Sequence, residues 1–547
     1  MKTGGEILIE CLEAEGVERA FCVPGESYLA VLDALHDSKI DVINARQEGG
    51  AAMMAEADGK MTGRPGVAFV TRGPGATNAA SGVHVAKQDS TPMVLFVGQI
   101  GRRMKGREAF QEVDFRQTFG DLAKWVEEID HADRIPEVVS HAWRVAMNGR
   151  PGPVVLSLPE DMLTETADAP RPAPRAEPVD PAPTPRNVSD FGALFAAAER
   201  PVLVLGGSRW DAAAVAAAQR FAERHDLPAT VTFRRQGLFD HEHPNYAGEL
   251  GIGPNPKLRE LVEGSDLLIL IGGRLSEMPS QGFSLLSIPT PQMKLVHVHP
   301  GPEELGRIYA PTLAINAAPG AFFDSVAELP ARAGAGAGAA AHAAYNDWSG
   351  QPPATPGDAE MGPIMSHLRA VAPDAILTNG AGNYATWTHR FWRFRRFGQQ
   401  LAPVCGSMGY GLPAAVAAKR RHPEAEVICF AGDGCFQMTM QEFGTLAQYD
   451  LPAIVLVVDN SIYGTIRMHQ ERDYPERISG TTLMNPDFAA IARAYGGHGE
   501  TVVKTEEFEG AFARARASGK PALIHIHTSP EAITPTMTIA GLRARKR

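Results

Sequence analysis

Several features that mark other classes of protein are absent from this 547-residue sequence. It has only five cysteines and no C-x-x-C spacing, so we expect neither a disulfide framework nor a zinc site. No run of 18 apolar residues occurs, and the opening MKTGGEILIECLEAEGV has the apolar period of a helix, unlike a signal peptide. We therefore expect a cytoplasmic protein with no membrane partner.

Basic residues are too few and too scattered for a nucleic-acid-binding protein. The formal net charge is −11, and Lys and Arg cluster in RFWRFRRFG at 390–398 and in LRARKR at the C-terminus. We interpret both clusters as packed or solvated surface, and we expect no nucleic-acid partner. With 44% hydrophobic and 21% charged residues, the chain has an ordinary globular composition.

Two stretches of unusual composition divide the chain. PRPAPRAEPVDPAPTP at 170–185 contains seven prolines, and ARAGAGAGAAAHAA at 331–344 consists mostly of small residues. The remaining segments alternate β-branched runs with amphipathic stretches, which is typical of parallel sheets covered by helices. The predicted fold is α/β, with three consecutive doubly wound parallel-sheet domains. The predicted regions are a first domain at 1–165, a linker at 166–187, a central domain at 188–328, a linker at 329–357 and a third domain at 358–547.

Oxygen-bearing side chains follow two apolar runs of the third domain. VICFA ends in Gly432-Asp433-Gly434, and IVLVVD ends just before Asn460, which lies 27 residues after Asp433 (460 − 433). Ligands bind at the carboxyl ends of parallel strands. A carboxylate and an amide oxygen suit Mg²⁺, which takes its other ligands from water and phosphate. A bare G-D-G is more often a simple strand-end turn, but this spacing and position favour a magnesium-bound diphosphate.

GDGCFQMTMQEFGTLAQYDLPAIVLVVDN resembles the G-D-G-x(about 26)-N motif with which thiamine diphosphate enzymes hold Mg²⁺ and their cofactor. The segments INARQEGGAAMMAEADGKMTGRPGVAFVTRGPGATN, PVCGSMGYGLPAAVAA and DNSIYGTIRMHQ resemble other parts of the same family. The resemblance implies three metal ligands, namely Asp433, Asn460 and the backbone carbonyl of Ile462. It implies contacts to thiamine diphosphate from Glu48, Gly406, Met408, Gly432, Asp433, Gly434, Cys435, Asn460, Ile462, Tyr463, Gly464 and Thr465.

By the same resemblance, Glu48 matches the glutamate that the family needs for catalysis. The cofactor removes its own C2 proton only when a buried acid protonates or hydrogen-bonds its N1′ atom, and a glutamate in an apolar pocket has a raised pKa. The alternative is that Glu48 is only an acid in the first turn of a helix. The carbonyl of Gly406 would accept a hydrogen bond from the 4′-amino group, and Met408 would hold the cofactor bent.

Two further segments resemble acetolactate synthases. EAFQEVD matches the stretch that places Phe110 and Gln111 in the substrate channel, and AKWV adds Lys124. Three departures stand out. His469 replaces the tryptophan that selects the acceptor, Glu26 replaces a glycine, and neither ELGIGPN nor VHVHPGPEEL has the pattern of a flavin site. We therefore doubt that FAD is bound, although these synthases carry it.

Glu26 leaves two interpretations open. An acid near the reactive carbon could donate the proton that ends turnover as an aldehyde, or Glu26 could simply begin a helix. For His84 and His469, two interpretations are also open: each is a buried or channel-rim histidine, or each has an acid–base role in catalysis. The catalytic candidates are Glu48, Gln111, Glu26 and His469.

The resemblance implies a thiamine diphosphate- and Mg²⁺-dependent carboligase, a transferase that decarboxylates a small 2-oxo acid and then forms a C–C bond. The alternative is a simple 2-oxo acid decarboxylase or aldehyde lyase. A nicotinamide dehydrogenase is disfavoured because GPGATN is not G-x-G-x-x-G. A catalytically silent scaffold should have lost Glu48 or Asp433. Because the family's cofactor lies between two subunits, we expect a homodimer or a dimer of dimers; a regulatory subunit is left open.

Overall fold

The computed structural model describes residues 1–332, 334 and 336–544. The chain divides into two compact units. The first comprises Met1–Val179, Val416–His422 and Thr439–Tyr449, and the second comprises Asp180–Ala415, Pro423–Met438 and Asp450–Arg547. Three six-stranded parallel sheets are present, which confirms the predicted α/β fold. Among the described residues, no helix is both long and apolar enough to cross a membrane.

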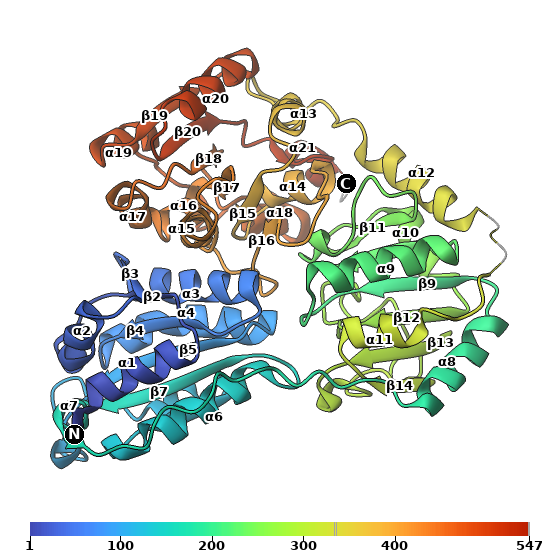
Figure 1. The fold of residues 1–547 in the computed structure, drawn as a ribbon. Helices are drawn as coiled ribbons and strands as arrows, with labels where there is room; N and C mark the ends of the chain where they lie inside the picture. The colour runs from blue at the N-terminus through green and yellow to red at the C-terminus, as the bar shows by residue number, and fades with distance from the viewer. Residues whose placement is uncertain (333, 335, 545–547) are drawn as a thin grey trace. The chain divides into compact units, whose positions relative to one another are not determined.

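The first unit is built on one of these sheets, and its inner strands β4 and β5 are continuous, fully buried runs because helices cover both faces. Helices α3 and α4 pack together on one face, and α1 and α6 lie on the other (Figure 1). In sheet order, the strands are β3 (Asp41–Asn44), β2 (Arg19–Cys22), β4 (Gly66–Val70), β5 (Met93–Gln99), β7 (Pro153–Pro159) and β6 (Trp125–Glu128). The main helices are α1 (Gly4–Ala14), α2 (Leu29–His36), α3 (Glu48–Thr62), α4 (Pro74–Asp89), α5 (Phe115–Phe119), α6 (Ile135–Met147) and α7 (Glu160–Thr164).

The second unit begins with the central sheet. Its aromatic-rich face packs against α8, α9 and α11, and α10 covers the other face. Helix α12 contributes Tyr345 to the first of these cores and Ala341 to the second. The strands are β11 (Tyr246–Leu250), β10 (Ala229–Thr232), β9 (Pro201–Leu205), β12 (Leu267–Ile271), β13 (Lys294–His299) and β14 (Leu313–Asn316). The helices are α8 (Pro185–Ala197), α9 (Ala212–Arg224), α10 (Pro256–Glu263), α11 (Pro319–Val326) and α12 (Ala337–Ser349).

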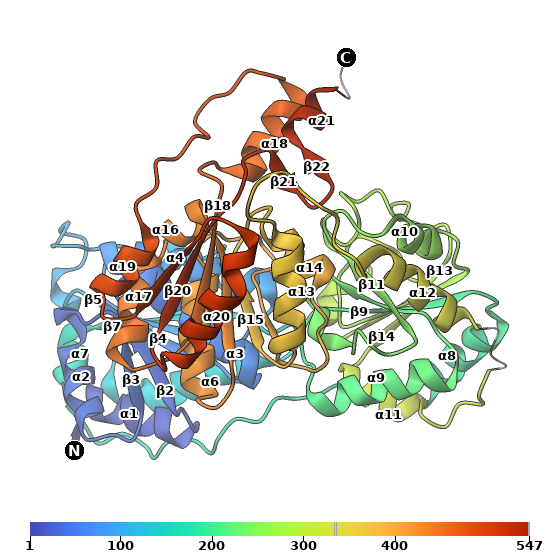
Figure 2. The same cartoon turned by 90° about the horizontal axis from the view of Figure 1, so that it is seen from above.

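The third sheet also belongs to the second unit. Helices α13 and α20 pack on one face, and α18 and α21 lie side by side near the hairpin β21–β22 (Figure 2). The strands are β16 (Gln400–Leu401), β15 (Ile376–Asn379), β17 (Val427–Gly432), β18 (Ile454–Asp459), β20 (Ala522–His527) and β19 (His498–Val502), with β21 (Ala532–Thr534) and β22 (Met537–Thr538) apart. The helices that follow in the chain are α13 (Met361–Val371), α14 (Ala385–Phe391), α15 (Gly411–Arg421), α16 (Asp433–Gln437), α17 (Phe443–Gln448), α18 (Gly464–Asp473), α19 (Phe488–Ala494), α20 (Phe508–Ala517) and α21 (Ile539–Ala544). Of these, α17 and the end of α15 from residue 416 belong to the first unit.

The stretch that joins the central and third domains contains more structure than its composition indicates. Helix α12 forms there, and its Tyr345 is buried against His241 and Tyr246. This packing adds to the helix propensity of its alanines, because most of the stability of a short helix comes from tertiary contacts. Residues 333 and 335 lie outside the described part. The proline-rich stretch 168–184, by contrast, contains neither helix nor strand.

Candidate active site

Two neighbouring strands of the third sheet bring the predicted metal ligands to one edge. Strands β17 and β18 pair in parallel with Gly432 opposite Val458, so the residues that follow both strands leave the sheet together. Asp433 begins α16 and is 4% exposed. Asn460 follows β18 directly, and its Oδ1 accepts a hydrogen bond from the amide of Ile462 at 3.3 Å.

A single amide side chain links the carboxylates that end these strands. Asn485 Nδ2 donates to Asp433 Oδ2 at 2.7 Å and to Asp459 Oδ1 at 2.8 Å. The Asn485 carbonyl accepts a hydrogen bond from Gln437 Nε2 at 2.9 Å, which fixes the orientation of the amide. On the next strand, His525 Nε2 lies 2.8 Å from Asp459 Oδ2. The edge is therefore a connected polar network in a buried setting.

The two carboxylates differ in their ionisation. Burial raises the pKa of Asp433 to about 6, and the nearby charge of Asp459 adds to this shift. Burial also disfavours the charge of Asp459, but hydrogen bonds from His525, Ser461 and Asn485 together hold its pKa well below the usual range. Among the described residues, no Lys, Arg or His side chain pairs with Asp433. A buried carboxylate without a basic partner, beside other oxygen ligands, fits a bound cation such as Mg²⁺.

Tyrosine rings pack directly against the two glycines around Asp433. A Cβ atom at position 432 would lie 2.8 Å from the ring of Tyr384, and one at position 434 would lie 2.6 Å from the ring of Tyr463. Both distances are far below a normal van der Waals contact, so neither position accepts a side chain while the rings remain in place.

The other predicted cofactor contacts of the third sheet lie on neighbouring loops. The Cys435 thiol bonds to the Gly409 amide and the Tyr384 hydroxyl, both at 3.2 Å. Gly406 has a left-handed φ of 73°, and Met408 is partly buried against the core of this sheet. Gly464 begins α18, and Thr465 Oγ1 donates to Asn383 Oδ1 at 3.0 Å. Asn383 follows β15, so three adjacent strands contribute to the same edge.

In the first unit, Glu48 begins α3. The Gln47 side chain caps this helix by accepting the amides of Gly49 and Gly50. Glu48 Oε2 accepts a hydrogen bond from Asn78 Nδ2 of α4 at 3.0 Å. A Cβ atom at Gly75 would lie 3.2 Å from Glu48 Oε1, so this carboxylate is held beside the start of α4.

The turn before α4 gathers other predicted residues of the first unit. The buried Arg72 donates to Glu26 Oε1 at 2.7 Å and to the carbonyl of Phe110 at 3.2 Å. A Cβ atom at Gly73 would lie 2.9 Å from the Gln111 Cβ. The structure therefore brings Glu26, Phe110 and Gln111 to the turn that also borders Glu48.

Three regions of this chain match a known family. Residues 2–118 match the N-terminal TPP binding domain of thiamine pyrophosphate enzymes, residues 188–326 match the central domain, and residues 380–526 match the C-terminal TPP binding domain.

The chain belongs to the thiamine pyrophosphate enzyme family.

The similarity extends over almost the whole chain. The acetolactate synthase large subunit of Parasynechococcus marenigrum is 33% identical over 550 residues, covering 96% of this chain and 87% of that protein. The isozyme 2 large subunit of Escherichia coli is 31% identical, with coverages of 96% and 95%. The probable large subunit of Methanocaldococcus jannaschii is 30% identical, with coverages of 98% and 94%. The predicted acetolactate synthase-like place within the thiamine pyrophosphate enzymes is thus confirmed.

Not every residue predicted for this thiamine pyrophosphate enzyme lies with the strand-end residues around Asp433 or with the residues at the Arg72 turn. Lys124 precedes β6 and therefore lies at the amino-terminal edge of the first sheet, opposite the Arg72 turn. Its Nζ donates to the carbonyls of Asn148 and Arg150. His84 on α4 and His469 on α18 are both exposed. The proposed roles of these three side chains stay predictions.

The sequence motifs of the family did not reveal Asn485, Arg72, Asn383 or Glu442. Glu442 is buried and accepts the backbone amides of Arg46 and Gln47, next to Glu48. Burial raises the pKa of Glu442 to about 7. Only Asn383, in the strand-end stretch NGAGN, carried a local signal of the kind that identified Asp433.

Proposed function

We propose that this thiamine pyrophosphate enzyme is a Mg²⁺-dependent carboligase, which decarboxylates a small 2-oxo acid and joins the remaining fragment to an acceptor carbonyl. The observation that carries the proposal is the buried Asp433, which lies at a strand end and has no basic partner among the described residues. The relatives named acetolactate synthase support this outcome. When bound, thiamine diphosphate supplies the electron sink that lets a 2-oxo acid lose carbon dioxide.

The proposed roles of the chain's own residues in binding the cofactor and Mg²⁺ are as follows. Asp433, Asn460 and the carbonyl of Ile462 would hold Mg²⁺, and the carboxylate of Glu48 would hold a proton or hydrogen bond at the pyrimidine N1′ atom. The backbone around Gly434 and Gly464 offers amides to a diphosphate. The remaining proposed cofactor contacts are Gly406, Met408, Gly432, Cys435, Tyr463 and Thr465.

Contacts of Glu26 favour the carboligase over the decarboxylase. One Glu26 oxygen already accepts a hydrogen bond from the buried Arg72, which also bonds Glu160 at 3.3 Å. The Glu26 carboxylate thus accepts a hydrogen bond from a guanidinium group in a fixed position. This arrangement is not expected of a carboxyl group that donates a proton. Phe110 is 72% exposed and lies beside this pair, so it is free to line a substrate channel together with Gln111.

Product analysis tests the proposed reaction. With pyruvate, Mg²⁺ and thiamine diphosphate, we expect the purified protein to release acetolactate as its main product. Nuclear magnetic resonance of the reaction mixture separates acetolactate from acetaldehyde. Glu26→Gln removes the acid but keeps the shape, and we expect it to leave acetolactate as the main product. Acetaldehyde as the main wild-type product would replace the carboligase by a simple decarboxylase.

We also propose that the central domain binds no flavin. Nucleotides bind doubly wound sheets at the carboxyl ends of their strands. At that edge, Trp210 Nε1 donates to the carbonyl of Gly206 after β9, and His297 Nε2 lies 2.9 Å from the carbonyl of Gly273 after β12. The Trp210 indole also packs against Phe323 in the core, so protein side chains close over these strand ends.

A purified sample is therefore expected to be colourless and to release no flavin on denaturation. The same protein, incubated with FAD and then desalted, should lose the added flavin. Stoichiometric flavin in either sample would contradict this proposal.

The proposed assembly is a cytoplasmic homodimer, or a dimer of dimers. Glu48 belongs to the first unit and Asp433 to the second. In the resembled family, a cofactor contacts the first domain of one subunit and the third domain of another, so a homodimer would contain two equivalent sites. The proposed domains remain 1–165, 188–328 and 358–547.

A further inference from the structure

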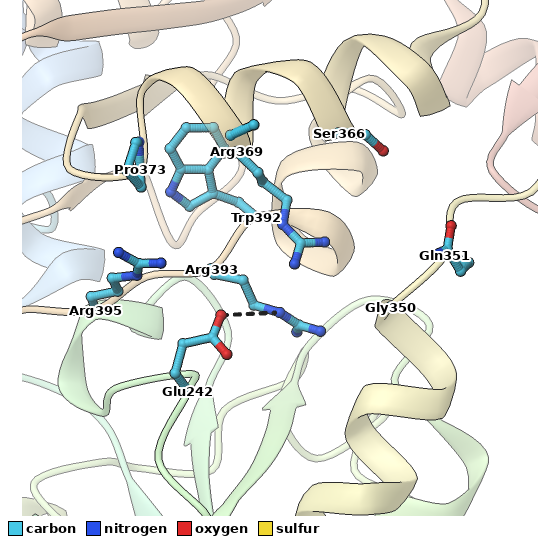
Figure 3. A pocket seen from close by; sticks show the side chains of 10 residues that line it. Glu242, Gly350, Gln351, Ser366, Arg369, Pro373, Trp392, Arg393 and Arg395 are labelled. Atoms are coloured by element: carbon cyan, nitrogen blue, oxygen red, sulfur yellow. Dashed lines mark ion pairs between the residues drawn. The ribbon is translucent and has the colours of Figure 1, made fainter.

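The arginine-rich segment RFWRFRRFG forms one wall of a cavity in the second unit (Figure 3). The cavity has a volume of about 410 Å³, which is within the range of about 300 to 1,000 Å³ of small-molecule sites. Helix α13 provides Arg369, the segment after α14 provides Trp392, Arg393 and Arg395, and a loop before β11 provides Glu242. None of the proposed cofactor contacts lines this cavity.

The four arginines of this segment have different environments. Arg390 donates two hydrogen bonds to the carbonyl of Trp348 and stacks on its ring, and Arg396 donates to the carbonyl of Asp374. These two are packed against backbone away from the cavity, as the sequence indicates. Arg393 and Arg395 instead line the cavity, which the sequence does not reveal.

Arg393 is buried and held in a fixed position. Its guanidinium donates to Ser349 Oγ at 2.8 Å and to Asn346 Oδ1 at 3.1 Å, and it lies over the ring of Tyr345. Its Nε is 3.8 Å from a carboxylate oxygen of Glu242. Because Glu242 is half exposed, Arg393 keeps a pre-oriented positive charge that this one acid only partly offsets.

Arg369 and Arg395 form no ion pair with an acid in the described part of the chain. Neither guanidinium has a hydrogen-bond or ion-pair partner within the part of the chain that the structure describes. Figure 3 shows the Arg369 side chain reaching down from α13 toward that of Arg393. Burial lowers the pKa of Arg369, and the charge of Arg393 adds to this effect. Three guanidinium groups thus face a single carboxylate.

A buried donor lies in the same wall. Trp392 is fully buried, and its indole Nε1 has no hydrogen-bond partner among the described residues. Buried donors are nearly always paired in folded proteins, so an unpaired donor beside unpaired guanidinium groups indicates a missing acceptor.

We propose that this cavity binds a small molecule through a phosphate group that the Arg369 and Arg393 guanidiniums hold between them, with Arg395 balancing the remaining charge. A tetrahedral dianion offers oxygens to two guanidinium forks at once, whereas a single carboxylate is satisfied by one. The volume leaves room for the rest of such a molecule. The site is separate from the diphosphate site at Asp433.

Titration with inorganic phosphate tests the site directly. The protein is first saturated with thiamine diphosphate and Mg²⁺ so that the cofactor site is filled, and binding is followed by phosphorus nuclear magnetic resonance. We expect Arg369→Gln to weaken phosphate binding by about tenfold, because it removes charge-assisted hydrogen bonds. Arg395→Gln should weaken binding by a smaller factor, because it removes only a nearby positive charge.

Arg396→Gln is the matched control, since it removes the same charge one residue away but outside the cavity. It should change the dissociation constant by less than about twofold. Thermal unfolding of the three variants checks that each is folded. The proposal is overturned if phosphate does not bind the saturated wild-type protein, if Arg369→Gln binds as the wild type does, or if Arg396→Gln loses as much affinity as Arg369→Gln.

Discussion

Asp433→Ala is expected to abolish retention of thiamine diphosphate. The variant removes the one buried carboxylate at the end of β17, so a bound diphosphate would face the protein without its bridging cation. Chelation of Mg²⁺ from the wild type should have the same effect. Cofactor retained after desalting, measured by fluorescence of its oxidised form, reports both results.

Thermal unfolding separates lost binding from lost folding. A ligand at 100 times its dissociation constant stabilises a protein by about 2.7 kcal/mol, and this gain should disappear in Asp433→Ala. Without cofactor, the variant should unfold no earlier than the wild type, because the lost carboxylate is buried beside Asp459. Asp324→Ala, at an exposed position on α11, should keep the full gain. Undiminished retention in Asp433→Ala would refute the metal assignment.

Glu48→Gln is expected to bind thiamine diphosphate but to slow exchange of its C2 proton by about 10²- to 10⁴-fold, the range for a lost general acid or base. Glutamine keeps the size of the side chain and its acceptor for Asn78, but it cannot protonate the N1′ atom. Hydrogen–deuterium exchange at C2 of the bound cofactor measures this step without turnover. Glu137→Gln, an exposed acid on α6, is the control. Exchange at the wild-type rate in Glu48→Gln would leave Glu48 as a helix acid only.

The same two variants test the proposed homodimer. Mixed dimers of Glu48→Gln and Asp433→Ala subunits would pair one doubly damaged site with one intact site. Random reassortment makes half of the dimers mixed, so activity should return to about a quarter of the wild-type level. If subunits exchange and nothing returns, each chain builds its own site.

What the sequence predicted well depended on local pattern. The position of Asp433 and Asn460 at one edge of the sheet could be predicted because strand ends can be recognised from apolar runs, and neighbouring parallel strands place their ends together. The position of Asn485 could not be predicted, because this residue reaches Asp433 from an irregular segment 52 residues further along the chain. The pairing of Arg72 with Glu26 likewise joins residues 46 positions apart, and no periodicity signals such a contact.

Composition and motifs predict structure less well where tertiary packing decides which elements form and where a residue lies. Helix α12 begins in a stretch of alternating Ala and Gly, and the packing of Tyr345 against His241 and Tyr246 adds stability to it. Lys124 illustrates the opposite case. Its motif predicts a place in the substrate channel, but the residue lies at the other edge of the first sheet, where two backbone carbonyls accept hydrogen bonds from its ammonium group.

The tyrosine rings beside Gly432 and Gly434 limit which substitutions this stretch can accept during evolution. A descendant that no longer needed its cofactor would still have no space for a side chain at either glycine while Tyr384 and Tyr463 remained. Asp433 would then be a buried charge without a purpose, and its replacement would be favoured. Packing thus keeps the two glycines of this motif, whereas Asp433 would be kept only by its proposed role in binding Mg²⁺. A homologue with Gly-Ala-Gly at these positions should therefore fold but no longer bind thiamine diphosphate. Cofactor analysis of such a protein would check this.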